Sequence, residues 1–256
     1  MDFSESGITI QVPPRGMSVA AEAIGSKGKA VELAIETRRD GSVVVHRGEQ
    51  AERVATVGRS SSPCGDGGYT LAGARWKSTY VWYASSANLP RNISFRGAES
   101  SFKKAISHIV NAYNDCGRQD AVSATAAYAG KTRSAPDISD SAACRSADGR
   151  NEMGFKRLPS GYLAYSCRWR SSIGTIVESD TAYNTRYKWY TSKPSNCYWR
   201  WSLENVATHE LGHSFGLSHV SESSHPRLTM STTIYPCQRG EATLGLGDMR
   251  GLEALY

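Results

Sequence analysis

Four side chains near the carboxyl end of the chain have the types and spacing of a metal-dependent catalytic site. The stretch THELGHSFGLSH holds His209, His213 and His219, three of the chain's six histidines, together with Glu210. Residues four apart lie on one face of a helix, so the imidazoles of His209 and His213 can converge on one ion. Gly216 tolerates the left-handed conformation that ends a helix, and the reversed chain can return His219 as a third nitrogen ligand.

This arrangement predicts hydrolysis by a metal-bound water. Zn²⁺ binds neutral histidine nitrogens at about 2.0–2.1 Å, and three protein ligands leave its fourth position open, as in catalytic sites. Glu210 points about 100° further round the helix than His209, from where its carboxylate could take a proton from that water as general base. We therefore expect one zinc ion held by His209, His213 and His219, with Glu210 as the catalytic residue. The alternative is an exposed helix face without metal, but the five fixed positions coincide by chance in only about one such chain in 70,000.

Helices and strands alternate around this motif and indicate an α+β fold. Three helices are predicted. The first is SLENVATHELGHSFG, capped by Ser202, and the second is SSFKKAISHIVNAYNDC, which also has a serine cap. The third is the short closing helix LGDMRGLEALY. The strand candidates between them are STYVWYASS, AVSATAAYAG, YLAYSCRWR and GTIVESDTAYNT.

The amino-terminal part has a different pattern. Residues 8–13, 31–37 and 42–46 are predicted to be short strands, and a polar linker is expected near 47–63. We therefore divide the chain into a small β-rich segment with its linker, 1–63, and a catalytic domain, 64–256. Three roles remain open for the first segment: a propeptide, a passive extension, or a module that tethers the protein to a surface or partner.

Composition limits the class of protein. The 256 residues are 39% hydrophobic and 21% charged, as in soluble globular proteins, and no apolar run approaches the length of a membrane span. The net charge is +6, and its densest basic stretch, RYKWYTSKPSNCYWRW, interleaves aromatics as nucleic-acid-binding segments do. A solvated loop anchored by its aromatics explains that stretch as well, and we favour it. We expect a monomer that acts on a peptide or protein, with no nucleic-acid or membrane partner.

The cysteines bear on the cellular compartment. Six cysteines are widely spaced, with no CxxC pair, which favours three disulfides in a secreted protein over six free thiols. Cys197 and Cys237 flank the histidine helix and the segment that follows it, and we expect them to be bonded to each other.

The motif HExxHxxGxxH is the signature of the metzincin metalloproteases, and further segments resemble one metzincin family, the matrixins. LTMSTTIYPC places Met230 eleven residues after His219, where metzincins have a methionine turn beneath the histidines. LGLGDMRGLEALY looks like the closing matrixin helix, and SGYLAYSCRW resembles the edge strand along which matrixins bind substrate. The resemblance covers residues 76–256 and is strongest to secreted bacterial matrixin-like proteins.

The resemblance implies a twisted mixed five-stranded sheet with three helices, and a secreted zinc endopeptidase that binds an extended peptide antiparallel to Leu163–Cys167. The alternative is a binding or inhibitory module on a catalytically silent metzincin fold. Glu210 argues against that alternative, because zinc binding alone does not require this carboxylate.

Some family features differ in this chain. The methionine turn is TMST, and residues 109–208 lack the histidines with which many matrixins hold a second, structural zinc, so one zinc is expected. Structural calcium is common in the family, but no acidic loop is convincing, and we expect Glu178 and Asp180 on the wet face of a strand. Cys64 lies where matrixin zymogens carry a zinc-capping cysteine. It is either such a switch or, as the even cysteine count favours, half of a disulfide.

Overall fold

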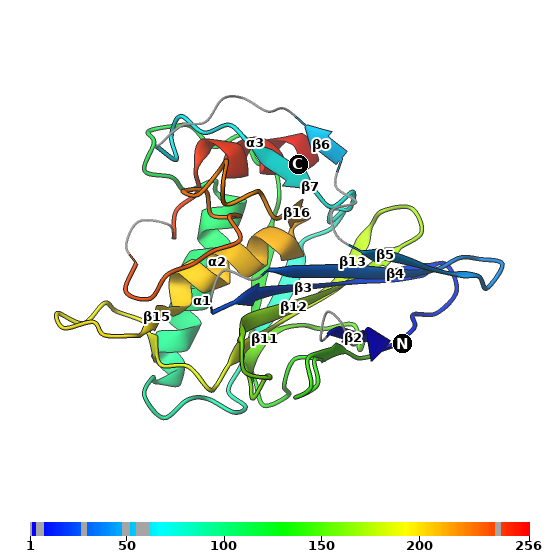
Figure 1. The fold of residues 1–256 in the computed structure, drawn as a ribbon, viewed down its shortest axis with the longest axis horizontal. Helices are drawn as coiled ribbons and strands as arrows, with labels where there is room; N and C mark the ends of the chain where they lie inside the picture. The colour runs from blue at the N-terminus through cyan, green and yellow to red at the C-terminus, as the bar shows by residue number, and fades with distance from the viewer. Residues whose placement is uncertain (1, 4–7, 27–29, 48–51, 55–61, 239–241) are drawn as a thin grey trace.

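The structure is a computed structural model that describes residues 2–3, 8–26, 30–47, 52–54, 62–238 and 242–256. One large sheet dominates it, with helices packed on one face (Figure 1). The strands of this sheet, in spatial order, are β5 (Val43–Arg47), β4 (Val31–Thr37), β3 (Met17–Gly25), β12 (Tyr162–Ser171), β13 (Ile176–Asn184), β11 (Asn151–Lys156), β8 (Tyr80–Ser85) and β9 (Ala126–Thr132). The short strands are β1 (Asp2–Phe3), β2 (Ile8–Ile10), β6 (Glu52–Val54), β7 (Tyr69–Leu71), β10 (Ala143–Cys144), β14 (Trp189–Tyr190), β15 (Trp201–Ser202) and β16 (Leu217–Ser218).

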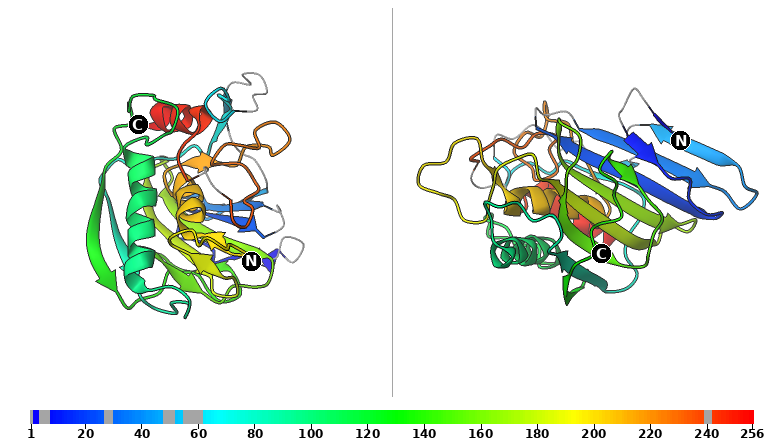
Figure 2. Two further views of the ribbon diagram at one scale, coloured as in Figure 1. Left: turned by 90° about the vertical axis from the view of Figure 1, so that its left-hand side faces the viewer. Right: turned by 90° about the horizontal axis from the view of Figure 1, so that it is seen from below.

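Three helices are described, α1 (Phe95–Val110), α2 (Leu203–Ser214) and α3 (Leu246–Leu255). Figure 2 shows α1 and α2 on the same face of the sheet, with α3 at one end. The Ser94 hydroxyl accepts a hydrogen bond from the Gly97 amide and starts α1 before the predicted serine, because this cap lies upstream of the apolar face. Ser202 caps α2 as predicted. None of the described helices is long and apolar enough to cross a membrane.

The sheet has more strands than predicted. The five strands β12-β13-β11-β8-β9 lie together in mixed orientation, but β3, β4 and β5 extend the sheet to eight strands among the described residues. The prediction that β12 is an edge strand is therefore wrong, because β3 pairs antiparallel with it along its outer side. An open edge leaves a row of backbone donors and acceptors without partners, and β3 satisfies that row.

Strand β3 was not predicted from its sequence, MSVAAEAIG. Alanine, glutamate and glycine are depleted in strands, so local propensity gave no signal. Its residues Ser18–Gly25 are buried in the centre of the sheet, which shows that position, not propensity, decided the structure.

A second hydrophobic cluster lies on the face of the sheet opposite the helices. The amino-terminal segment, residues 1–63, contributes Ile8, Val19 and Ile35 to this cluster. Tyr165 and Trp169 of β12, which belong to the rest of the chain, pack in the same cluster. The amino-terminal strands therefore share a sheet and a core with the rest of the chain (Figure 2).

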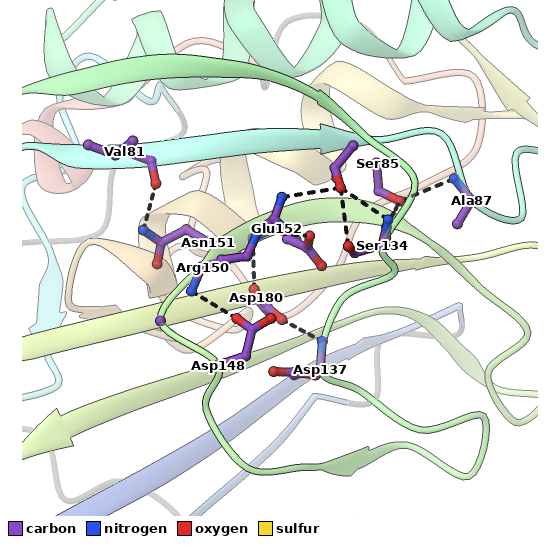
Figure 3. Close-up of polar contacts among 12 residues, drawn as sticks. Val81, Ser85, Ala87, Ser134, Asp137, Asp148, Arg150, Asn151, Glu152 and Asp180 are labelled. Atoms are coloured by element: carbon purple, nitrogen blue, oxygen red, sulfur yellow. Dashed lines mark hydrogen bonds and ion pairs between the residues drawn. The ribbon is translucent and has the colours of Figure 1, made fainter.

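Glu178 and Asp180 of β13 are buried, so their predicted position on a wet strand face is wrong. The segments on either side of β10 and the start of β11 bind them. Glu178 accepts hydrogen bonds from the amides of Asp148 and Gly149. Asp180 accepts hydrogen bonds from the amides of Asp137 and Glu152, and Figure 3 shows both of these contacts. The period-two pattern identifies a strand but cannot show which of its faces a distant loop will cover.

Candidate metal centre

Helix α2 and the turn after it bring the three predicted histidines together. His209 and His213 lie one turn apart on α2, and Gly216, with φ of +100°, reverses the chain so that His219 returns. The three Nε2 atoms are 3.1–3.2 Å from one another. Nitrogens bound tetrahedrally to one zinc at 2.0–2.1 Å are separated by roughly 3.3 Å. The described residues therefore fit a single zinc ion with three protein ligands.

Backbone carbonyls orient two of the imidazoles. Nδ1 of His209 lies 2.7 Å from the Thr229 carbonyl, and Nδ1 of His213 lies 3.0 Å from that of Leu217. A carbonyl only accepts, so each Nδ1 carries the proton and each Nε2 presents a lone pair to the centre. Burial lowers the pKa of His209 to about 4 and those of His213 and His219 well below the usual value. All three rings are therefore neutral near pH 7, which is the form that binds metal.

Glu210 is fully buried next to the first histidine. Ser166 of β12 donates a hydrogen bond from Oγ to Oε2 of Glu210 at 2.6 Å, whereas Oε1 has no hydrogen-bond partner among the described residues. Burial raises the pKa of Glu210 to about 8, and the Ser166 hydrogen bond acts in the opposite direction. The positive charge of a zinc ion held by the neighbouring histidines would lower this pKa again and favour the ionised carboxylate. One carboxylate oxygen is thus held by the sheet, and the other is left for a group outside the protein.

Met230 lies beneath α2, where the resemblance places a methionine turn. A Cβ on Gly212 would collide with the Met230 sulfur, so only glycine permits this approach. Asp248 of α3 accepts hydrogen bonds from the amides of Thr229 (2.9 Å) and Met230 (3.1 Å). The closing helix therefore fixes the turn, and Thr229 in turn holds His209.

Besides Ser166, sequence reasoning missed an ion pair next to the site. Arg168 of β12 donates from Nη1 to the His213 carbonyl, and its Nη2 lies 2.6 Å from Oε1 of Glu22 on β3. Both side chains are at most 1% exposed, and burial raises the pKa of Glu22 to about 7 although Arg168 opposes the rise. An isolated arginine and glutamate 146 positions apart give no local signal that they will pair.

All six cysteines are bonded, in the pairs Cys64–Cys116, Cys144–Cys167 and Cys197–Cys237. The predicted Cys197–Cys237 bridge is confirmed. The alternative of six free thiols is wrong, and so is the zinc-switch alternative for Cys64 in this structure, because its sulfur is bonded to Cys116.

The Cys197–Cys237 bridge anchors the basic aromatic stretch RYKWYTSKPSNCYWRW to the segment after the histidine helix. Trp189 and Trp201 within it are buried, while Tyr198 and Trp199 are exposed.

We expect Cys64→Ser to destabilise the protein without activating it. Loss of a native disulfide typically costs about 2–5 kcal/mol of unfolding free energy, and the bonded sulfur gives no reason for a higher rate per folded molecule. Denaturant unfolding and active-site-normalised rates measure the two effects, with Cys116→Ser as the matched control. A strongly activated Cys64→Ser protein of unchanged stability would restore the switch.

Three features together are typical of the metzincin class of zinc peptidases. They are a helix with two histidines and a glutamate, a glycine turn that returns a third histidine, and a methionine turn beneath them. Residues 159–256 match the family model described as Matrixin, a stretch that begins just before β12 and contains α2, the methionine turn and α3. Over this stretch the chain is similar to the matrixins, and the match supports a matrixin-like metzincin of the zinc metallopeptidase kind.

Proposed function

We propose that the protein is a secreted zinc-dependent endopeptidase in which His209, His213 and His219 hold one zinc ion and Glu210 is the general base. The convergence of three neutral Nε2 atoms within 3.2 Å of one another carries this proposal. The buried Glu210 beside them, with one free carboxylate oxygen, supports the hydrolytic role.

Each residue has a distinct part in the reaction. A bound zinc would polarise the scissile carbonyl and lower the pKa of a water. Glu210 accepts a proton from this water at Oε1, and the water oxygen bonds to the carbonyl carbon. Glu210 then delivers the proton to the leaving amine as the C–N bond breaks. Ser166 keeps the carboxylate in position by holding Oε2.

The alternative of a silent binding module would require neither Glu210 nor its contact with Ser166. A peptide library incubated with the purified protein, with and without a chelator, distinguishes the two functions. Chelator-sensitive cleavage within peptides supports the endopeptidase, and no cleavage by zinc-loaded protein favours the silent module.

Three disulfides that use every cysteine support an oxidising, extracellular location. We propose that residues 64–256 carry the catalytic machinery and act as a monomer on peptide or protein substrates. Residues 1–63 form an accessory segment, whose strands β3–β5 border the catalytic sheet.

We expect Ser166→Ala to lower kcat roughly tenfold, because a hydrogen bond to a charged group contributes about 1.5 kcal/mol or more. KM should change little, since the Ser166 hydroxyl contacts the base, and the substitution leaves the backbone of β12 unchanged. Ser166→Thr, which keeps the hydroxyl, should recover most of the rate. Unchanged kcat in Ser166→Ala would show that the contact does not position Glu210.

A further inference from the structure

Strand β3 occupies the side of β12 where the proposed function places the substrate. It runs antiparallel to β12, with Ile24 opposite Ala164, Glu22 opposite Ser166 and Ala20 opposite Arg168. An extended peptide added to this edge would make the same kind of backbone ladder. The chain therefore already contains, bound at this edge, a segment in the conformation expected of a substrate (Figure 1).

The side chains proposed for catalysis are closed to solvent in this arrangement. His209 and Glu210 are 0% exposed, His213 is 1% exposed and His219 is 5% exposed. A peptide that lies along β12 beside these groups needs the edge of β12 that β3 now occupies. Strand β3 is the segment whose place a substrate strand would take.

Glu22 shows what chemistry a replacement for β3 has to supply. Residues opposite each other in a ladder point to the same face, and Ser166 points toward Glu210 on the α2 side. Glu22 points to that side as well and reaches Arg168, whose other amino group holds the His213 carbonyl. The carboxylate of β3 is thus connected through a single guanidinium to a residue of the metal centre.

Arg168 requires a counterion in this place. Its side chain is 1% exposed beside β3, and withdrawal of Glu22 removes its ion-pair partner. A peptide that covers Arg168 again without supplying a carboxylate would leave a buried, unpaired guanidinium, which is strongly unfavourable. A cavity of about 160 Å³ beside it is lined in part by Arg168, Arg170 and Ala20 of β3. A peptide that takes the place of β3 restores the pair only if it carries a carboxylate at the same position.

We propose that β3 is an exchangeable occupant of the β12 edge, and that Arg168 selects peptide substrates with Glu or Asp at the position facing Ser166. This inference rests on the proposed peptidase function. Arg168 is then a specificity-determining residue, and Glu22 is the group of this chain that a substrate carboxylate displaces.

A reversible covalent lock tests the exchange in the full chain. Met17 and Ser171 lie opposite each other at one end of the ladder, so Met17→Cys/Ser171→Cys can form a disulfide across it. We expect the oxidised double variant to lose at least tenfold in peptide cleavage and mild reductant to restore it. The matched control, Glu36→Cys/Val44→Cys, locks β4 to β5 and should be equally active in both states. Mapping of the disulfides verifies both locks, and the wild type in the same reductant controls for the native bridges.

Matched substrates test the selectivity. In a positional library whose members differ only by Glu or Gln at one position, we expect kcat/KM to favour Glu at least tenfold at a single position. Arg168→Met should bring that ratio close to 1, which a purely structural role of Arg168 would not do. If Arg168→Met does not fold, Glu22→Gln provides the second test. It should cleave Glu-containing peptides about tenfold faster than wild type, and the control Glu36→Gln should not.

The outcomes separate the two proposals. Cleavage that is insensitive to the β3 lock, or indifferent to Glu against Gln, overturns the inference and leaves the peptidase function intact. Absence of cleavage in every variant and redox state, with zinc bound, overturns the peptidase function and this inference with it.

Discussion

The Glu210→Gln protein is expected to retain its zinc and to hydrolyse peptides about 100-fold to 10,000-fold more slowly than wild type, the usual range for loss of a general base. The amide has nearly the shape of the carboxylate and can still accept a hydrogen bond from Ser166, so the packing around it should persist. It cannot take a proton from water. Metal analysis and steady-state kinetics on the same preparation measure the two effects together.

Glu204→Gln is the matched control. Glu204 lies on the same helix, but its carboxylate interacts with Lys104 and His108 at the surface of α1. Its substitution should leave turnover near wild type. A Glu210→Gln protein that keeps full activity would mean that another residue is the base, and the proposed mechanism would be wrong.

The His213→Ala protein is expected to lose both zinc and activity. Two imidazoles remain, and the cluster is buried, so water cannot readily replace the third ligand. Metal analysis should fall from one zinc per chain toward zero, and cleavage should drop to the level of the chelator-treated wild type. Readdition of zinc should restore the stripped wild type but not His213→Ala.

His225→Ala serves as the comparison for a histidine outside the metal centre. Nδ1 of His225 is hydrogen-bonded to Oδ1 of Asp66 at 2.7 Å. Replacement of His225 by alanine should leave the zinc content at one per chain. Two zinc ions in the wild type, or zinc retained by His213→Ala at full stoichiometry, would contradict the three-histidine site.

Features that depend on neighbours along the chain could be predicted. The helical repeat places His209 and His213 on one face of α2, and Ser202 and Gly216 mark its ends because capping and positive φ are local requirements. The same locality explains why β8, β9, β12 and β13 were recognised, whereas β10 and β11 were not predicted. The β-rich character of the amino-terminal segment was recognised as well, although β3 itself was missed.

Features that depend on pairing between distant segments needed the tertiary structure. Nothing near Ser166 indicates a contact with Glu210, and Cys64 could be given a partner only once Cys116 was seen beside it. Glu178 and Asp180 were misplaced for the same reason, because the loop before β11 and β11 itself supply amides that bind these buried carboxylates.

By itself the sequence determined the residues of the candidate metal centre: the three histidines, the glutamate and the turn that gathers them, all within a dozen residues. Only the tertiary structure decided which segments and side chains surround these residues. It placed β3 along β12 and joined Glu22 to Arg168. The physical reason is that a helix specifies its side-chain positions by its own repeat, whereas a strand offers hydrogen bonds on both sides and its partner depends on the whole chain.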